Sequence, residues 1–316
     1  MRWAFLFFAA LVLAGCSQPG NIILNEEGDI SVYFCPRDDC MGKVVSLVND
    51  AKSSVHCAFY DLDLNDIISA LSEKAKEIDV KSVIDDENIG SLSGSSIRQD
   101  IPKHTMHNKF CIIDSKVVWA GSFNPTETGN FHNNNNMVVF HSSYLAQNYE
   151  DEFIELWGGT FGDGAKVKHP AIYLNGTKIE NYFCPEDNCA ARVINELNKA
   201  KESVYFMTFS FTNEGIADAL LFNENITIEG VFEKGQNTKY SQFNRLNGFG
   251  VDVKVDSNPA NMHHKVFVID NETVITGSFN PSQNADISND ENLLIIHDED
   301  ISKMFLDEFR FVWPSD

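Results

Sequence analysis

Residues 107–124 read HNKFCIIDSKVVWAGSFN, and residues 263–280 read HHKVFVIDNETVITGSFN. Both stretches follow the pattern His-x-Lys-(x)4-Asp-(x)6-Gly-Ser-x-Asn, and each matched position of the second copy lies 156 residues after its counterpart. A pattern of this length, repeated at one constant offset, indicates an internal duplication. The sequence therefore predicts two related halves that contribute equivalent residues to one site.

Each copy supplies a histidine and a lysine two positions apart. Alternate side chains of a strand share a face, so His107 and Lys109 can reach one ligand, and so can His263 and Lys265. A histidine can act as a nucleophile or as a general acid, and ammonium groups stabilise the charged oxygens of a phosphoryl group. The doubled pattern is therefore typical of a site that holds one phosphate between two halves.

The aspartate of each copy, Asp114 or Asp270, follows the histidine by seven residues. Seven is an odd step, which puts the aspartate on the opposite face of a regular strand. We expect both aspartates to support local structure, at a turn or a neighbouring strand, without touching substrate.

Helix-like and strand-like segments alternate in the same order in both halves. Residues 55–60 and 204–209 are β-branched and aromatic, as strands prefer, and follow helix-like residues 41–51 and 190–200. This alternation predicts an α/β sandwich in each half. The expected segments are a signal peptide (1–15), a lipidated linker (16–28), a first half (29–160), a linker (161–178) and a second half (179–316).

The first residues read as an export signal. A basic start and an apolar run precede Leu13-Ala14-Gly15-Cys16, which resembles a lipobox, where the signal is cut before a cysteine that is then acylated. An ordinary signal peptide with a chance cysteine is the alternative. The lipobox interpretation predicts an exported lipoprotein anchored to a membrane through Cys16, at the cell surface or the periplasmic face.

The formal charge of the chain is −22. Such a charge repels nucleic-acid backbones at long range, and phosphate contacts dominate most nucleic-acid binding. A local basic cleft inside an acidic surface would still allow a nuclease activity. Solubility explains the negative charge equally well. Nucleic acid is therefore a disfavoured partner.

Four cysteines occupy two copies of Tyr-Phe-Cys-Pro-x-Asp-x-Cys. An exported chain meets an oxidising compartment, so each loop is predicted to hold a disulfide, Cys35–Cys40 and Cys184–Cys189. A four-cysteine metal site, which needs the two loops to converge, is the alternative. Cys57 and Cys111 lie in apolar strand-like runs and are predicted to be small buried residues.

Both motifs resemble those of the phospholipase D superfamily, also called the HKD family, and the resemblance covers essentially the whole mature chain. It implies two pseudo-symmetric α/β/α sandwich halves whose motifs meet across a pseudo-twofold axis in one active site. Because one chain holds both motifs, a monomer is expected. The residues that the resemblance marks as catalytic are His107, Lys109, Asp114, His263, Lys265 and Asp270.

The resemblance also implies a mechanism without metal or cofactor. One histidine attacks phosphorus and becomes phosphohistidine, while the other protonates the leaving oxygen. Family precedent favours His107 as the nucleophile, and the symmetry of the sequence leaves the assignment open. The substrate-binding set is Asn124, Asn280, Ser122 and Ser278, with the serines expected to bind backbone or a histidine ring in preference to phosphate.

A carboxylate that orients a catalytic histidine is expected near residues 289–292. Glu291 matches this role, but its counterpart in the first half is Asn135, so one side departs from the family pattern. His104 and His264 flank the motifs and are expected to be exposed bystanders, with pocket walls as the alternative.

The favoured function is a membrane-anchored phosphodiesterase of phospholipase D type that cleaves phospholipid headgroups. A nuclease is the alternative, because the halves are compact and lack long substrate loops. Phosphatidyl transfer, as in cardiolipin synthases, differs only in the acceptor. A lipid-anchored binding protein without turnover is a further possibility that the intact motifs disfavour.

Overall fold

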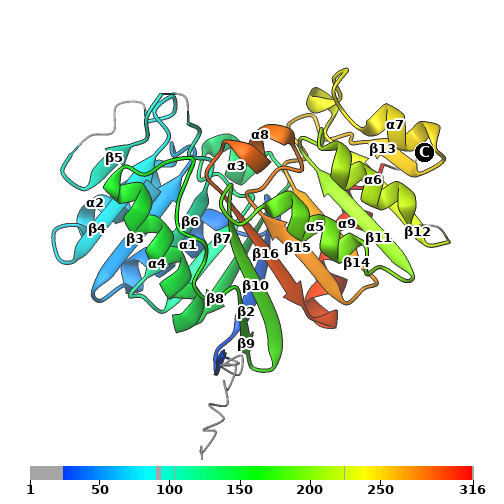
Figure 1. Cartoon of the computed structure of the whole chain (residues 1–316). Helices are drawn as coiled ribbons and strands as arrows, with labels where there is room; N and C mark the ends of the chain where they lie inside the picture. The colour runs from blue at the N-terminus through cyan, green and yellow to red at the C-terminus, as the bar shows by residue number, and fades with distance from the viewer. Residues whose placement is uncertain (1–23, 90–93, 103, 224, 315–316) are drawn as a thin grey trace, which may run out of the picture.

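The computed structural model describes residues 24–89, 94–102, 104–223 and 225–314, and it contains one sheet of seven strands and one of nine (Figure 1). The signal peptide and Cys16 lie outside the described residues. In spatial order, the first sheet consists of β2 (Ile30–Cys35), β8 (Asn135–His141), β7 (Val117–Gly121), β6 (Lys109–Ile113), β3 (Ser54–Phe59), β4 (Asp79–Ile84) and β5 (Ile97–Gln99).

The second sheet repeats this order. Its strands are β1 (Leu24–Glu26), β9 (Ala171–Leu174), β10 (Thr177–Cys184), β16 (Glu291–His297), β15 (Thr273–Gly277), β14 (Lys265–Ile269), β11 (Ser203–Thr208), β12 (Thr227–Phe232) and β13 (Asp252–Val255). From β10 to β13 each strand takes the place of its counterpart in the first sheet, with β11, β12 and β13 parallel as β3, β4 and β5 are. The predicted duplication is therefore a duplication of the fold.

The edge of the second sheet uses segments outside the repeat. β1 comes from the segment predicted as the N-terminal linker, and β9 from the predicted linker between the halves. The two strands pair in parallel, with Leu24 opposite Ile172. The chain that precedes the first half therefore joins the sheet of the second half.

Helices cover both faces of each sheet, as predicted for α/β/α sandwiches. The helices are α1 (Cys40–Asp50), α2 (Asn65–Lys74), α3 (Glu127–Phe131), α4 (Ser143–Gly158), α5 (Cys189–Leu197), α6 (Glu214–Phe222), α7 (Phe243–Gly248), α8 (Gln283–Ile287) and α9 (Glu299–Val312), with a 3-10 turn, η1, at Lys234–Gln236. The two long helices begin at side-chain caps, because Ser142 accepts from the amide of Leu145 and Asp298 from that of Ile301.

Long helices α4 and α9 lie at the junction of the halves. α4 packs on its own sheet and contacts β10, while α9 packs on its own sheet and contacts β2. Tyr149 and Phe153 of α4 join Phe305 and Phe309 of α9 in one buried apolar cluster that draws on both sheets. This shared core holds the halves together, while α1 with α2 and α5 with α6 belong to two separate clusters.

Three disulfides are present among the described residues. Cys35–Cys40 and Cys184–Cys189 close the two predicted loops. The prediction for Cys57 and Cys111 was incomplete: both are buried, but they form a third disulfide. The pairing of β3 with β6 places Cys57 directly opposite Cys111, and this long-range register brings the two sulfurs together.

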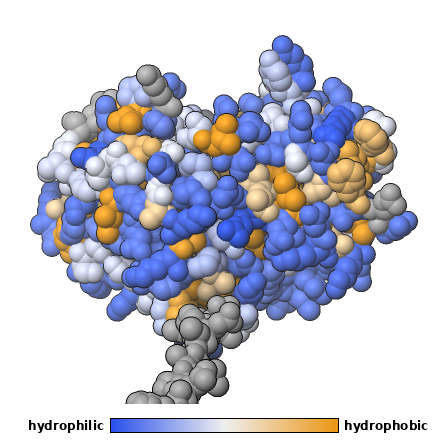
Figure 2. Space-filling model, viewed as in Figure 1, coloured by the Kyte–Doolittle hydropathy of each residue, from blue (hydrophilic) through white to orange (hydrophobic). Residues whose placement is uncertain are grey.

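Within the described part of the chain, no helix combines the length and apolar character needed to cross a membrane. The face of the molecule in Figure 2 is mostly hydrophilic, and its apolar residues form small separate groups.

Candidate active site

The two histidine loops are joined to the opposite halves. His107 lies two residues before β6, and its amide donates to the carbonyl of Asp290 at 3.0 Å. His263 lies two residues before β14, and its amide donates to the carbonyl of Asn134 at 2.9 Å. Short parallel bridges, Met106 with Asp290 and Asn134 with Met262, complete these junctions. Each loop is thus held by the half to which it does not belong.

Each imidazole is oriented across the same boundary. Nδ1 of His107 lies 2.8 Å from Oε2 of Glu291, and Nδ1 of His263 lies 2.8 Å from Oδ1 of Asn135. His263 Nδ1 also lies 3.1 Å from the carbonyl oxygen of Ser122. Oxygen acceptors at Nδ1 place the ring proton there and leave Nε2 for chemistry. Glu291 therefore lies where a residue that orients a catalytic histidine must lie, and Asn135 takes the equivalent place.

Lys109 and Lys265 are both buried and equivalently held. The Nζ atom of each donates to the carbonyl of its own histidine, at 2.5 Å for His107 and 2.8 Å for His263. Burial lowers the pKa of Lys109 to about 7, against the opposing effect of Glu291. Burial also lowers the pKa of Lys265 well below its usual range, and Lys109 adds to this effect. The two ammonium groups therefore lie close enough to repel each other.

The histidines share the same electrostatic environment. Burial lowers the pKa of His107 well below its usual range, and Lys109 and Lys265 lower it further. The pKa of His263 is lowered by burial, by both lysines and by His107. Since each imidazole interacts with both lysines, the two motifs converge on one site. Without a bound anion the uncharged imidazole is favoured at both positions, which is the form that a nucleophile needs, whereas a general acid must be protonated.

An aromatic ring packs against each histidine–lysine pair. The Tyr60 ring meets that of His107 edge-on at 4.7 Å, and the Phe209 ring meets that of His263 at 4.6 Å. The lysine Nζ atoms lie 4.7 Å from the same rings. Sequence reasoning missed these residues, although both directly follow equivalent strands, β3 and β11. Each partly buried ring thus packs against the histidine and the lysine of its own motif.

The asparagines of the motifs carry unpaired polar atoms. The Oδ1 atoms of Asn124 and Asn280 are buried, and neither accepts a hydrogen bond from any described residue. The same orphaned atom at two equivalent positions is consistent with amides that bind a ligand, because buried polar groups are otherwise almost always paired.

The hydroxyl groups of both motif serines form hydrogen bonds with other groups of the protein. Oγ of Ser122 accepts from the amide of Asn136 at 2.9 Å, and Oγ of Ser278 accepts from the amide of Asn292 at 3.0 Å. Ser278 also donates to Oε2 of Glu291 at 2.6 Å. These contacts fit the expectation that both serines bind backbone, and Ser278 also helps to hold Glu291, while the place of Ser122 and Ser278 in the substrate-binding set stays a prediction.

The motif aspartates lie away from the histidines. Asp114 accepts from the amides of Lys52, Ser53 and Ser54 at 2.6–3.1 Å, and Asp270 accepts from the equivalent amides of residues 201–203 at 2.8 Å. These contacts fit the expected structural role, and the place of both aspartates in the catalytic set stays a prediction. The geometric reason differs from the expected one, because both follow the end of a strand in the left-handed conformation, with φ of 54° and 53°.

His264 is not an exposed bystander. It is fully buried, and its ring nitrogens lie 3.1 Å from Nδ2 of Asn136 and 3.0 Å from Oε1 of Glu308. Arg37 of the first half forms an ion pair with the same Glu308. The expectation of exposure was wrong because a carboxylate 44 residues away satisfies the ring. His264 thus belongs to the boundary between the halves.

Buried carboxylates hold the backbone just before each histidine. Asp100 accepts from the amide of Met106 at 2.9 Å, and Glu233 accepts from the amide of Met262 at 2.8 Å. Among the described residues, one acidic group could hold a metal ion, and it consists of Asp100, Asp85 and Asp86. Since the oxygens of Asp100 already accept two backbone amides, this group serves the histidine loop.

Comparison with known proteins agrees with this geometry. A family model described as "Cardiolipin synthase, PLD-like domain" matches residues 44–157 and 193–313. A phospholipase D from Rickettsia conorii is 31% identical over 145 residues, which cover 45% of this chain and 72% of that protein. The human mitochondrial cardiolipin hydrolase is 31% identical over 130 residues, which cover 40% of this chain and 52% of that protein.

A solved structure matches over both halves. The phosphatidylserine synthase of Haemophilus influenzae aligns with a TM-score of 0.61 and 14% identity, over 88% of this chain and 84% of that one. This similarity concerns the fold alone. Two copies of the domain, each matched by the family model and each with an intact motif, show that the chain belongs to the phospholipase D superfamily, as a member with both repeats in one polypeptide.

Proposed function

We propose that this protein is a phospholipase D-type phosphodiesterase that hydrolyses phospholipid headgroups through a phosphohistidine, without a metal ion. One observation carries the proposal: two imidazoles, each oriented through Nδ1 by the opposite half, interact with the same two buried lysines. A nucleophile, an acid and positive charge around one phosphorus are what phosphodiester cleavage requires.

The proposed reaction has two steps. The bound phosphodiester anion favours the protonated form of His263. Nε2 of His107 attacks phosphorus, the bond from phosphorus to the headgroup oxygen breaks, and protonated His263 donates its Nε2 proton to that oxygen. Water then attacks the phosphohistidine, His263 takes a proton from the water, and the phosphorus–nitrogen bond breaks to release phosphatidate and restore both rings.

The contact with Glu291 supports His107 as the nucleophile. An imidazole phosphorylated at Nε2 that keeps its Nδ1 proton carries a positive charge, which a carboxylate stabilises better than an amide does. Glu291 faces His107, whereas Asn135 faces His263. The ring beside the carboxylate is therefore the better carrier of the phosphoryl group.

Substrate charge supports the role of the lysines. Burial lowers the pKa of Lys109 and of Lys265. A phosphodiester anion between them favours their charged forms, since an opposite charge nearby stabilises an ammonium group. The lysines then supply the positive charge that metal ions supply in other phosphodiesterases. The amides of Asn124 and Asn280 complete the binding of the phosphoryl oxygens.

Three observations favour a lipid substrate. The similar Rickettsia protein is named a phospholipase D and the human one a cardiolipin hydrolase. The formal charge of −22 opposes polynucleotide binding. The lipobox-like segment ending at Cys16 would anchor the exported protein, and with it the site, to a membrane. Phosphatidyl transfer is the second candidate, because the matched family model bears the name of cardiolipin synthase.

The test compares substrates under one condition. The full-length chain in detergent micelles is assayed with headgroup-labelled phospholipid vesicles and with single-stranded DNA, each with and without EDTA. We expect release of the headgroup that survives EDTA and is absent in His107→Ala. Cleavage of DNA alone would contradict the lipid substrate, and loss on chelation would contradict the metal-free mechanism. Added glycerol distinguishes transfer from hydrolysis by the product formed.

A further inference from the structure

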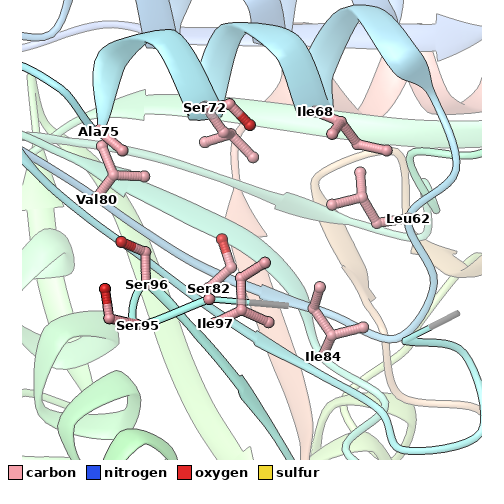
Figure 3. Close-up of a pocket in the computed structure, with 12 residues that line it drawn as sticks. Leu62, Ile68, Ser72, Ala75, Val80, Ser82, Ile84, Ser95, Ser96 and Ile97 are labelled. Carbon is pink, nitrogen blue, oxygen red and sulfur yellow. The ribbon is translucent and has the colours of Figure 1, made fainter. Parts of the chain in front are cut away.

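The first half contains an apolar cavity that the site described above does not use. It lies between helix α2 and strands β4 and β5 and has a volume of about 250 Å3 (Figure 3). Six aliphatic side chains contribute to its lining, and they are Leu62, Ile68, Leu71, Val80, Ile84 and Ile97. Serine hydroxyls, among them that of Ser72, are the polar groups of the wall.

The cavity is elongated along β4. Leu62 and Ile84 lie toward one end, and Ala75 and Val80 lie toward the other (Figure 3). The four-residue step from Val80 to Ile84 spans roughly 13 Å of extended strand. The long axis thus follows the strand from its beginning to its carboxyl end.

The Leu62 end lies at the edge of the sheet where the parallel strands β3 and β4 end, with Phe59 opposite Ile84, and this is the edge of the candidate active site. Leu62 follows Tyr60 by two residues, and the Tyr60 ring packs on His107 at 4.7 Å. Ile84 directly precedes Asp85, a carboxylate close enough to Lys109 to raise its pKa against the effect of burial. One end of the cavity therefore lies at the same edge of the sheet as the first histidine–lysine pair, and the cavity runs from there toward the beginning of β4.

The equivalent space in the second half is filled. Phe211 and Phe232, the counterparts of Leu62 and Ile84, stack with ring centroids 5.6 Å apart. Phe243 of α7 meets Phe232 edge-on at 5.4 Å, and Leu246 of the same helix is fully buried. In the first half 12 residues separate β4 from β5, whereas 19 separate β12 from β13 and include α7. Between these described residues the second half therefore has no counterpart of the apolar cavity, and its larger pocket, lined by Ser210, Thr212 and residues 239–242 among others, lies at a different place.

We propose that this cavity binds an acyl chain of the phospholipid whose phosphodiester lies between the two histidine–lysine pairs. The inference rests on the proposed function, and it adds a determinant of lipid recognition. If a methylene occupies about the volume of a water molecule, roughly 30 Å3, the cavity holds roughly eight methylenes. Each buried methylene strengthens binding roughly fourfold. A polynucleotide has no apolar chain to place there.

The experiment fills the cavity from α2. Ser72→Phe places a ring in the lining, and Ser69→Phe is the matched control, because both serines are exposed on the same helix and only Ser72 lines the cavity. Ala75→Trp fills the far end. The full-length variants are assayed in detergent micelles with didecanoyl and dibutanoyl phosphatidyl-p-nitrophenol, and with bis(p-nitrophenyl) phosphate, which has no acyl chain.

The wild type should prefer the decanoyl over the butanoyl ester. Ser72→Phe should lower kcat/KM for the decanoyl ester by roughly tenfold or more, the equivalent of about two buried methylenes, and leave bis(p-nitrophenyl) phosphate within roughly twofold. Ala75→Trp should lower kcat/KM for the decanoyl ester alone, and Ser69→Phe should change kcat/KM for none of the three substrates. Retained activity on bis(p-nitrophenyl) phosphate shows that each variant is folded.

Two outcomes overturn the inference in distinguishable ways. If both filling variants keep the wild-type decanoyl preference, the cavity does not bind the chain, while phosphatidyl ester cleavage still supports the proposed function. If the wild type cleaves bis(p-nitrophenyl) phosphate and DNA but neither phosphatidyl ester, the proposed function fails and the inference fails with it.

Discussion

Oε2 of Glu291 lies 2.8 Å from Nδ1 of His107, so the histidine of the first half is oriented by a carboxylate of the second. The reciprocal contact is not equivalent, because Asn135 provides an amide oxygen to His263. Two motifs that match at every defined position therefore differ in the group behind the imidazole. This difference provides the physical basis for distinct roles of the two histidines.

Replacing Glu291 by glutamine should reduce kcat by roughly 10- to 100-fold, the usual range for a residue that orients a reacting group. Burial raises the pKa of Glu291 to about 8, and a cationic phosphohistidine beside it favours the charged carboxylate. The amide keeps the shape of the side chain but cannot take that charge. KM should change little, since Glu291 is fully buried behind the ring. Steady-state kinetics on a phosphatidyl ester measure both constants, and an unchanged kcat would contradict the role.

Replacing Asn135 by aspartate is the companion variant. A carboxylate beside His263 favours the imidazolium, so the pKa of that ring should rise. If His263 is the acid, it then stays protonated to higher pH, and the alkaline limb of the kcat profile should move upward. A shift of the acidic limb in its place would assign His263 as the nucleophile.

Replacing either histidine should separate the two steps. His107→Asn removes the proposed nucleophile and should abolish formation of the phosphoenzyme. His263→Asn, assayed with a p-nitrophenyl ester whose leaving group needs no acid, should form the phosphoenzyme and hydrolyse it slowly. Mass spectrometry of the acid-labile adduct gives the answer, and an adduct that forms only in His107→Asn would reverse the assignment.

Replacing Asp114 by alanine should lower stability without lowering kcat. The change leaves the amides of Lys52, Ser53 and Ser54 without their acceptor, at a cost on the order of 1–3 kcal/mol. Urea unfolding with activity measured per folded molecule checks both parts. Asp270→Ala should behave in the same way, and a large loss of kcat in either variant would place the aspartates in the catalytic set.

The Asp114 carboxylate also makes the stability of the folded protein depend on pH in the acid range. Burial raises the pKa of Asp114, but hydrogen bonds from Ser53, Ser54 and Lys52 outweigh it and lower the pKa from 3.8 to about 2. A lowered folded-state pKa contributes stability that is present above 3.8 and is lost as pH falls through 2. The stability difference between wild type and Asp114→Ala should therefore narrow between these values, and a difference that stays constant would contradict the assignment.

Removal of the disulfides should have unequal effects. Cys57 and Cys111 are 54 residues apart, whereas Cys35 and Cys40 are 5 apart. Loop-closure entropy predicts a loss of about 4 kcal/mol for the long loop and about 2 kcal/mol for the short one. Unfolding of the double alanine variants under oxidising conditions compares the two pairs, and equal losses would show that loop length does not govern stability here.

Replacing Cys16 by serine tests the proposed lipid anchor. Metabolic labelling with palmitate should be lost, and the protein should move from the membrane to the soluble fraction. Hydrolysis of a short-chain ester should be retained, because Cys16 lies outside both halves. Identical fractionation of wild type and variant would favour the ordinary signal peptide.

Much of this fold follows from the duplicated pattern. The repeated order of strands and the shared site of His107 and His263 were predictable, because residues that match at a constant offset occupy equivalent places in equivalent folds. The role of Asp114 was also predictable, although the parity argument reached it through a regular strand where the chain in fact turns. Both predictions came from the repeat and from strand periodicity, whereas the partners of Asp114, about 60 residues earlier in the chain, could not be named from the sequence.

The remaining features depend on contacts between distant residues. The disulfide of Cys57 with Cys111 follows from the register of β3 against β6, which no local pattern specifies. The burial of His264 follows from its contact with Glu308 in α9. Asn135 was visible as a departure from the family pattern, but only the packing of the halves shows that it faces a histidine.

The bridges that join each histidine loop to the other half have an evolutionary consequence. A mutation at position 135 acts on the reactivity of a ring encoded by the downstream repeat, and a mutation at 291 acts on a ring encoded upstream. Natural selection on either residue therefore acts through the reactivity of the histidine in the opposite repeat. The two copies are therefore constrained to change together at positions 135 and 291.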